Sequence, residues 1–265
     1  MEENYLELNK DAWNKKTSYH IESDFYKMDA FVEGESSLNS IELDLLGDIK
    51  DKTILHLQCH FGQDSLSLSR KGAVVTGVDF SENAIEKARE VNENLGLDAQ
   101  FICCDIYNLP KHLNKQFDIV YTSYGTIGWL PDLDKWANVV SQFLKPGGTF
   151  VIVDFHPVVW MFDNDFTYFQ YSYFKREPIV EIESGTYADV NAPIETKTIS
   201  WNHSLGEILG NLINSGLEII DFKEYDYSPY NCFKNMYEPE AGKFRIKSQE
   251  DKIPMVYSVV ARLKK

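Results

Sequence analysis

Short apolar runs alternate with amphipathic stretches between residues 53 and 154. Five runs have the length of a buried strand: 54–57, 73–78, 100–104, 117–122 and 149–154. Between them, apolar residues recur every three or four positions, as they do on one face of a helix. This alternation predicts parallel strands joined by right-handed helical crossovers. Ligands of such sheets bind at the carboxyl ends of the strands.

Helix signals support this interpretation. A short helix from about residue 64 to residue 70 is followed by Gly72, and glycine is favoured just beyond a helix C-terminus. Ser81 is placed to cap a longer helix, and Pro131-Asp132 to start another. Lys145-Pro146-Gly147-Gly148 predicts the turn that leads into the run 149–154.

The flanking regions have different patterns. Residues 1–52 predict helical and irregular structure without a strand. Residues 157–200 are rich in aromatic side chains and predict two or three antiparallel strands, although aromatic residues are also simply common in strands. A helix over 205–213 and strands over 217–227 and 254–263 then predict an antiparallel pair at the end of the sheet.

Composition excludes some classes of partner. The chain has 265 residues and a formal net charge of −15, whereas nucleic acids and anionic membranes require basic surfaces. It contains no apolar run near the ~18 residues of a membrane span and no basic leader with an apolar core. A soluble, cytoplasmic protein is expected.

The four cysteines lack a C-x-x-C spacing and suggest neither a disulfide framework nor a metal site.

Two neighbouring features suggest a nucleoside ligand. The turn at 58–62 opens onto a helix N-terminus, whose unpaired N–H groups suit a polar or anionic group. Asp79 ends the next strand, 17 positions after Gly62 (79 − 62), where a carboxylate can accept hydrogen bonds from ribose hydroxyls. Alone, Asp79 is equally well explained as an exposed acid before a helix. Together, the two features favour a nucleoside cofactor.

The turn lacks the G-x-G-x-x-G of dinucleotide sites. H-L-Q-C-H-F-G followed by G-V-D-F-S instead resembles the first motif of one bacterial branch of class I S-adenosylmethionine-dependent methyltransferases. His56 replaces the expected acid, and Gln58 and His60 replace two glycines. Because non-glycine residues are strained at positive φ, we expect the turn to follow a different path, with both side chains contacting the cofactor. F-D-I-V and L-K-P-G-G extend the resemblance.

The resemblance implies an α/β, Rossmann-like sheet, mostly parallel with an antiparallel C-terminal strand. It also implies three parts, namely an N-terminal helical lid (1–52), a methyltransferase core (53–156 and 201–265) and an inserted substrate cap (157–200). The implied cofactor is S-adenosylmethionine, with no metal. The implied cofactor-binding residues are Gln58, Cys59, His60, Gly62, Asp79, Phe80, Asp105, Ile106, Ser123 and Tyr124.

Candidates for the acceptor side follow from position. His156 ends a strand and His203 precedes a helix, so each is a candidate base, although a structural hydrogen bond is the commoner role of a lone histidine. Aromatic residues of the lid, the strand ends and the cap are candidate substrate contacts: Tyr19, Tyr26, Trp129 and Trp160.

The sequence therefore predicts methyl transfer to a small-molecule acceptor, without nucleic acid or membrane partners. A non-catalytic module that binds S-adenosylmethionine or another nucleoside is the alternative, because two glycines of the motif are replaced. A nicotinamide oxidoreductase is disfavoured by the missing dinucleotide motif. The acceptor, the methylated atom and the oligomeric state stay open.

Overall fold

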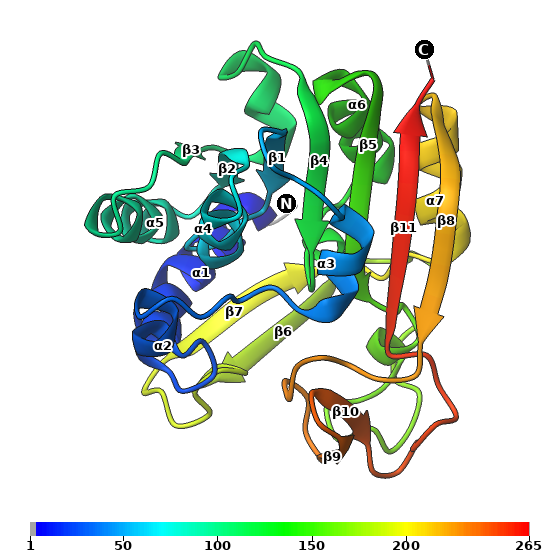
Figure 1. Ribbon diagram of the computed structural model, residues 1–265. Helices are drawn as coiled ribbons and strands as arrows, with labels where there is room; N and C mark the ends of the chain where they lie inside the picture. The colour runs from blue at the N-terminus through cyan, green and yellow to red at the C-terminus, as the bar shows by residue number, and fades with distance from the viewer. Residues whose placement is uncertain (1–3, 265) are drawn as a thin grey trace.

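The computed structural model describes residues 4–264 and has a seven-stranded sheet at its centre (Figure 1). The spatial order is β3-β2-β1-β4-β5-β11-β8. The bounds are Thr53–Leu57 (β1), Val74–Asp79 (β2), Gln100–Cys103 (β3), Phe117–Ser123 (β4), Leu144–Phe155 (β5), Leu217–Tyr225 (β8) and Val256–Leu263 (β11). Neighbours from β3 to β5 pair in parallel, and β11 runs antiparallel to β5 and β8. The mostly parallel sheet predicted from the sequence is confirmed.

Helices cover both faces of this sheet. One face carries α6 (Leu133–Phe143) and α7 (Leu205–Asn214), and the other carries α3 (Ser40–Leu46), α4 (Gln63–Arg70) and α5 (Glu82–Asn94). Successive strand residues point to opposite faces. In β1, Leu55 and Leu57 therefore join the core under α6 and α7, whereas Ile54 joins the other core. Burial on both faces explains why these strands are continuous apolar runs in the sequence.

The N-terminal helix α1 (Tyr5–Glu22) lies between α5 and a strand pair outside the main sheet, β6 (Ile179–Ser184) and β7 (Glu195–Ser200) (Figure 1). Asn9 fixes this position, because its side-chain amide donates to Ile199 O at 2.7 Å and accepts from Ile199 N at 2.8 Å. A short helix α2 (Met28–Val32) follows. The first segment and the insertion are thus packed against each other.

Three details differ from the sequence predictions. The strand predicted to begin at Thr149 begins at Leu144, because Leu144 already pairs with Phe117 and the ladder then resumes at Thr149 opposite Ile119. The aromatic-rich start of the insertion contains the short helix η3 (Val159–Met161) and an isolated bridge from Phe162 to Phe169, and its strands come later. The hairpin of β9 (Met236–Glu240) and β10 (Lys243–Ile246) was not predicted.

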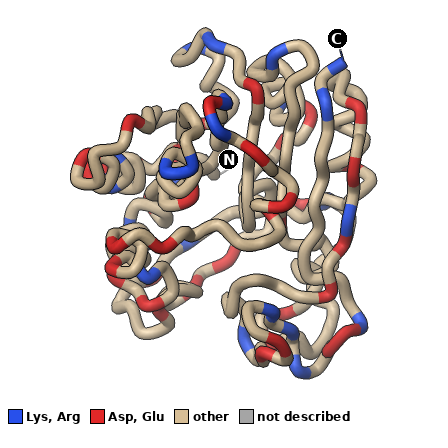
Figure 2. The backbone as a smooth tube through the Cα atoms, in the orientation of Figure 1, with Lys and Arg blue, Asp and Glu red and all other residues tan. Residues whose placement is uncertain are grey.

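Residues 4–264 include no helix that is both long and apolar enough to cross a bilayer. Asp and Glu are spread along the described chain and interspersed with Lys and Arg, as Figure 2 shows, without separating into an acidic and a basic half. All four cysteines are free thiols, and Cys59 is buried. The described residues contain no group of three or more His, Cys, Asp or Glu side chains suited to a metal ion.

Candidate cofactor site

The turn after β1 keeps the left-handed backbone that glycines would provide. Gln58 has φ 55°, His60 φ 50° and Gly62 φ 77°. The different path expected from the strain of non-glycine residues is not seen in φ, since Gln58 and His60 both adopt positive values. At about 1–2 kcal/mol per non-glycine residue, this strain must be offset by contacts. Gln58 Nε2 donates to Thr126 O at 2.8 Å, and Cys59 N donates to Val78 O at 2.9 Å.

Asp79 joins this turn to the end of β2. Its carboxylate accepts hydrogen bonds from His60 N and Ser81 N, both at 2.9 Å. Burial raises the pKa of Asp79 to about 6, and the hydrogen bonds from the backbone N–H groups limit this rise. Each carboxylate oxygen has a further lone pair, so Asp79 can still accept hydrogen bonds from a ligand diol.

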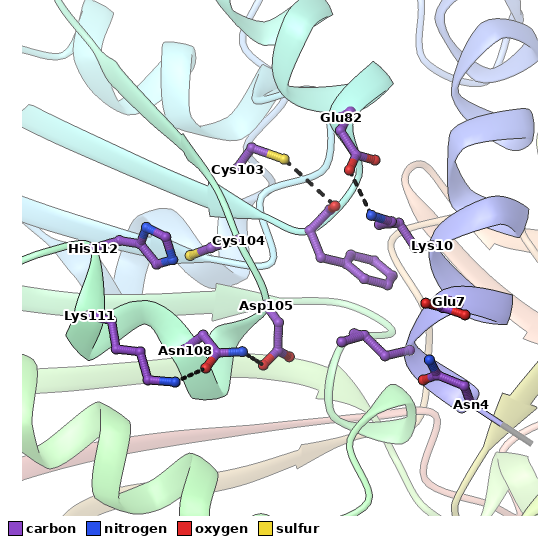
Figure 3. Close-up of a pocket in the computed structure, with 12 residues that line it drawn as sticks. Asn4, Glu7, Lys10, Glu82, Cys103, Cys104, Asp105, Asn108, Lys111 and His112 are labelled. Carbon is purple, nitrogen blue, oxygen red and sulfur yellow. Dashed lines mark hydrogen bonds and ion pairs between the residues drawn. The ribbon is translucent and has the colours of Figure 1, made fainter. Parts of the chain in front are cut away.

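A cavity of about 500 Å³ opens beside the ends of β2 and β3 (Figure 3). Sites for small molecules commonly have about 300–1,000 Å³. Phe80, Cys104 and Asp105 line the cavity from the sheet, and Leu6 and Lys10 line it from α1. Burial raises the pKa of Asp105, which accepts a hydrogen bond from Asn108 at 3.3 Å. The cavity thus combines an aromatic ring with a carboxylate acceptor, as recognition of a purine requires.

Helix α1 covers the edge of the sheet next to this cavity. Lys10 pairs with Glu82 at 2.7 Å, and Asn14 Oδ1 accepts from Ser81 Oγ at 2.7 Å. The Trp13 ring meets the rings of His60 and Trp129 edge-on, with centroids 5.2 and 5.6 Å away. The space directly beyond the turn is therefore filled with aromatic rings. Lys10 and Asn14 had no recognisable signal in the sequence, because their hydrogen-bond partners Ser81 and Glu82 lie 67 or more positions away.

His60 also contacts α1 through a second histidine, His20. His60 Nε2 lies 3.0 Å from His20 Nδ1. Burial lowers the pKa of His60 to about 3. Burial lowers the pKa of His20 to about 2, and the nearby His60 and Lys16 contribute to this decrease. Both rings are therefore neutral at physiological pH. Cys59 and Ile106 are both buried core residues, and neither lines the cavity.

The end of β4 lies farther along the same edge. Ser123 Oγ donates to Asp64 Oδ2 at 3.3 Å, and the Tyr124 hydroxyl donates to Glu42 Oε2 at 3.0 Å. The loop that follows is fixed by Asp154, which accepts from Gly125 N and from Thr126 Oγ1, the latter at 3.0 Å. Asp154 was not singled out in the sequence, although an acid at the end of a strand is the same signal that identified Asp79.

The two candidate bases have other partners. His156 is buried, accepts from Val158 N at 3.1 Å through Nδ1, and has Nε2 2.9 Å from Glu224 on β8. His203 Nε2 donates to Leu130 O at 2.8 Å, and its Nδ1 lies 3.0 Å from Glu207. Neither histidine lines the cavity. Their predicted catalytic role gains no support from these positions.

The candidate substrate residues are not grouped together. The Tyr26 hydroxyl bonds to that of Tyr187 in the insertion, and its ring contacts Phe61. Trp129 donates from Nε1 to Gly125 O at 2.7 Å and meets Trp13, whereas Trp160 is exposed and packs on Phe155 and Phe233. Tyr19 is half-buried on α1. Tyr26 and Trp129 lie beside the turn region, and Trp160 lies beyond the end of β5.

Comparison with known proteins agrees with this geometry. Residues 54–148 match the methyltransferase domain family. This similarity extends from β1 into the start of β5. A crystal structure of an S-adenosylmethionine-dependent methyltransferase from Clostridium acetobutylicum superposes with a TM-score of 0.58 at 17% identity, covering 97% of this chain and 99% of that one. The class I methyltransferase resemblance and the fold class predicted from the sequence are confirmed.

Two curated relatives are similar over part of their length. An uncharacterised methyltransferase of Synechocystis is 33% identical over 133 residues, which are 49% of this chain and 60% of the relative. A ubiquinone biosynthesis O-methyltransferase of Coxiella burnetii is 35% identical over 100 residues, which are 38% of this chain and 42% of the relative. The chain thus spans about half the length of these relatives, and the similarity concerns the methyltransferase domain.

Proposed function

We propose that this protein binds S-adenosylmethionine at the edge formed by the turn 58–62, Asp79 and the cavity, and transfers its methyl group to a small-molecule acceptor. The observation that carries the proposal is the cavity itself, which lies at the carboxyl ends of β2 and β3 and is lined by Phe80 and Asp105. Purine stacking on Phe80 and hydrogen bonds to Asp79 and Asp105 use groups that are already in place.

The residues present fit this cofactor. Gln58 Oε1 is buried beside the turn and has no hydrogen-bond partner, so it can accept from a bound ligand. The cofactor, when bound, supplies an electrophilic methyl group on a sulfonium. The protein's contribution is alignment, which in well-oriented systems is worth up to about 7–11 kcal/mol. The α1 rings that cover the turn exclude water from the same place.

A small acceptor is supported by two further features. The formal net charge of −15 disfavours nucleic acid. The methyltransferase domain is covered on its ligand-binding edge by α1, which is itself bound to β7 of the insertion. A ubiquinone O-methyltransferase among the relatives is a precedent for a small acceptor in a similar domain.

Calorimetric titration with S-adenosylhomocysteine tests the cofactor site. Wild-type protein should bind, and Asp79→Asn should bind at least tenfold more weakly, because an amide can accept at one atom only. Glu86→Gln, an exposed change on α5, is the matched control and should bind as wild type does. Unchanged affinity in a folded Asp79→Asn variant would remove Asp79 from the site.

Binding without transfer is the second candidate function. It is favoured by the rings of Trp13, His60 and Trp129, which pack together beyond the turn, and by the absence of His156 and His203 from the cavity lining. A screen of amines, phenols, thiols and carboxylates with radiolabelled S-adenosylmethionine separates the two. Transfer to any acceptor excludes the non-catalytic alternative.

A further inference from the structure

A group of polar side chains, two of them buried and three half-buried, lies between α3, α4 and the end of β4, apart from the cavity. We call it the Asp64 cluster, and it comprises Ser37, Glu42, Asp64, Tyr121 and Ser123. Asp64 Oδ1 accepts from Ser37 Oγ at 2.6 Å, and Asp64 Oδ2 accepts from Ser123 Oγ at 3.3 Å. These neutral hydroxyls are the hydrogen-bond partners of a carboxylate in the first turn of α4, directly after the 58–62 loop.

The two acids of the cluster differ in their structural role. Glu42 is fully buried and forms the capping box of α3, in which its Oε1 accepts from Asn39 N at 2.8 Å. Its second oxygen accepts from the Tyr124 hydroxyl. The Asp64 side chain forms no comparable helix cap. Its buried charge therefore calls for another explanation.

No cation balances these acids within the described chain. Among residues 4–264, neither Glu42 nor Asp64 forms an ion pair with Lys, Arg or His. Burying an unpaired carboxylate costs several kcal/mol. Burial and the charge of Glu42 accordingly raise the pKa of Asp64 to about 7. A cation brought from outside would remove this cost.

Tyr121 gives an independent indication of a missing ligand. Its side chain is fully buried, and its hydroxyl has no hydrogen-bond partner. Alternate residues of a strand share a face, so Tyr121 points to the same side of β4 as Ser123, which donates to Asp64. Desolvation makes the largest contribution to the raised pKa of Tyr121, and the charges of Glu42 and Asp64 make the next largest. The hydroxyl thus lies near the acids and beside the Ser123 hydroxyl, without a hydrogen bond of normal geometry to either.

Aromatic rings from three separate segments lie over this cluster. Phe25 stacks on Tyr230 with centroids 5.7 Å apart, and meets Tyr187 of the insertion at 5.4 Å. Tyr230 in turn meets Tyr124 edge-on at 4.9 Å. Hydrogen bonds join these rings to the cluster, because the Tyr124 hydroxyl donates to Glu42 and the Tyr230 hydroxyl accepts from Asn39 at 2.8 Å. Aromatic faces attract cations.

We infer that Asp64, with the hydroxyls of Ser37, Ser123 and Tyr121 around it, is a subsite for an organic ammonium group under an aromatic cover. This inference rests on the proposed function for the identity of its occupant. The ammonium belongs either to the amino-acid end of the cofactor or to an amine-bearing acceptor. The chemistry of recognition is the same in both cases, since an ammonium donates to the carboxylate and to the hydroxyl oxygens.

Paired ligands that differ only in the amine separate the two sources. The first pair is S-adenosylhomocysteine and its analogue without the α-amino group. The second pair is 2-phenylethylamine and 2-phenylethanol, titrated in the presence of saturating S-adenosylhomocysteine and followed by ligand-observed NMR. Each pair is measured with wild type, with Asp64→Asn and with the exposed control Asp98→Asn.

Wild type should prefer the ammonium member of at least one pair by tenfold or more. Asp64→Asn should abolish that preference and leave the neutral member unaffected, and Asp98→Asn should change neither. Preference in the first pair identifies the cofactor as the source, and preference in the second identifies the acceptor. Tyr121→Phe keeps the packing and should reduce the same preference about threefold, which tests the subsite independently should Asp64→Asn fail to fold.

Two results would overturn the inference: no preference in either pair for wild type, or a preference that survives in folded Asp64→Asn. The proposed cofactor site fails by a different result, namely when neither nucleoside of the first pair binds wild-type protein. The second pair would then still report on the Asp64 cluster, because the amine and the alcohol do not depend on the nucleoside.

Discussion

Around β2 and β3, the site is made by strand ends and one turn that follow each other closely in the chain. Beyond β4, it is made by side chains that α3, α4, the insertion and the loop before β9 bring together. Asp79 takes its two backbone donors from residues within 19 positions, whereas Phe25, Tyr187 and Tyr230 span most of the chain. In the proposed function, the first region binds the cofactor that such domains share, and the second is free to differ in its ligand.

A substitution in the turn 58–62 of the first region should have the largest effect on the protein. Gly62→Ala would place a Cβ 2.6 Å from Phe101 Cε1, at a residue with φ 77°. Backbone strain of about 1–2 kcal/mol and overpacking of about 1–3 kcal/mol predict a loss of roughly 2–5 kcal/mol in the free energy of unfolding, measured by urea denaturation.

Gly96→Ala provides the matched control. Gly96 has φ 62°, and nothing lies within 4 Å of its added Cβ, so this variant carries the backbone strain without the collision. It should lose only about 1–2 kcal/mol. Equal losses in the two variants would show that the close approach of the turn to Phe101 is not what requires glycine.

Asp64→Asn should stabilise the empty protein at high pH. The pKa of Asp64 is about 7 in the folded state against an ordinary 3.8. Between these pH values the folded state keeps a proton that the unfolded state releases, so wild-type stability falls as pH rises and the full cost is present above pH 7. The amide avoids this cost, and we expect a gain of about 1–3 kcal/mol at pH 8.

The gain should disappear at pH 4, where the carboxyl is protonated in the folded state. The other titratable groups facing Asp64 are Glu42 and the phenols of Tyr26, Tyr121 and Tyr230, and the phenols stay neutral because their pKa values are raised. Urea denaturation at both pH values makes the comparison. A variant that is less stable than wild type at pH 8 would mean that the cluster is already balanced without a ligand.

These two regions also differ in how far the sequence predicts them. Asp79 ends β2, Phe80 and Asp105 follow strands, and the parallel order of those strands brings their ends to one edge. The strand pattern alone therefore pointed to Asp79 as a candidate, and the family resemblance added Phe80 and Asp105. Lys10, Asn14 and Tyr187 reach the site only because α1 and the insertion dock there, and no local pattern encodes that docking. His156 shows the limit of the strand-end rule, since β5 ends beside β11 and the His156 ring contacts Glu224 of β8, on the far side of β11.

Phe80→Ala should weaken S-adenosylhomocysteine binding by about tenfold or somewhat more, since stacking of a base on an aromatic ring is worth about 1–3 kcal/mol. The ring lines the cavity and is partly exposed, so the melting temperature should change little. Phe169→Ala, an exposed change in the insertion, is the control and should bind as wild type does. If Phe80→Ala retained full affinity, the purine would have to lie elsewhere.

The smallest effect is expected where the two regions meet, at the hydrogen bonds that hold α1 against the start of α5. Asn14 accepts from Ser81 Oγ at 2.7 Å and donates to Glu82 at 3.0 Å, directly beside Asp79. Asn14→Ala removes both bonds but leaves Asn9 bound to Ile199, so α1 should stay docked and open more often. We expect the dissociation rate of S-adenosylhomocysteine to rise about two- to fivefold in stopped-flow measurements, in line with the roughly 0.5–1.5 kcal/mol of one net hydrogen bond. Lys15→Ala, which removes only the exposed pair with Asp11, should leave the rate unchanged. An unchanged rate in Asn14→Ala would show that α1 does not gate the cofactor site, and that the two regions exchange ligands independently.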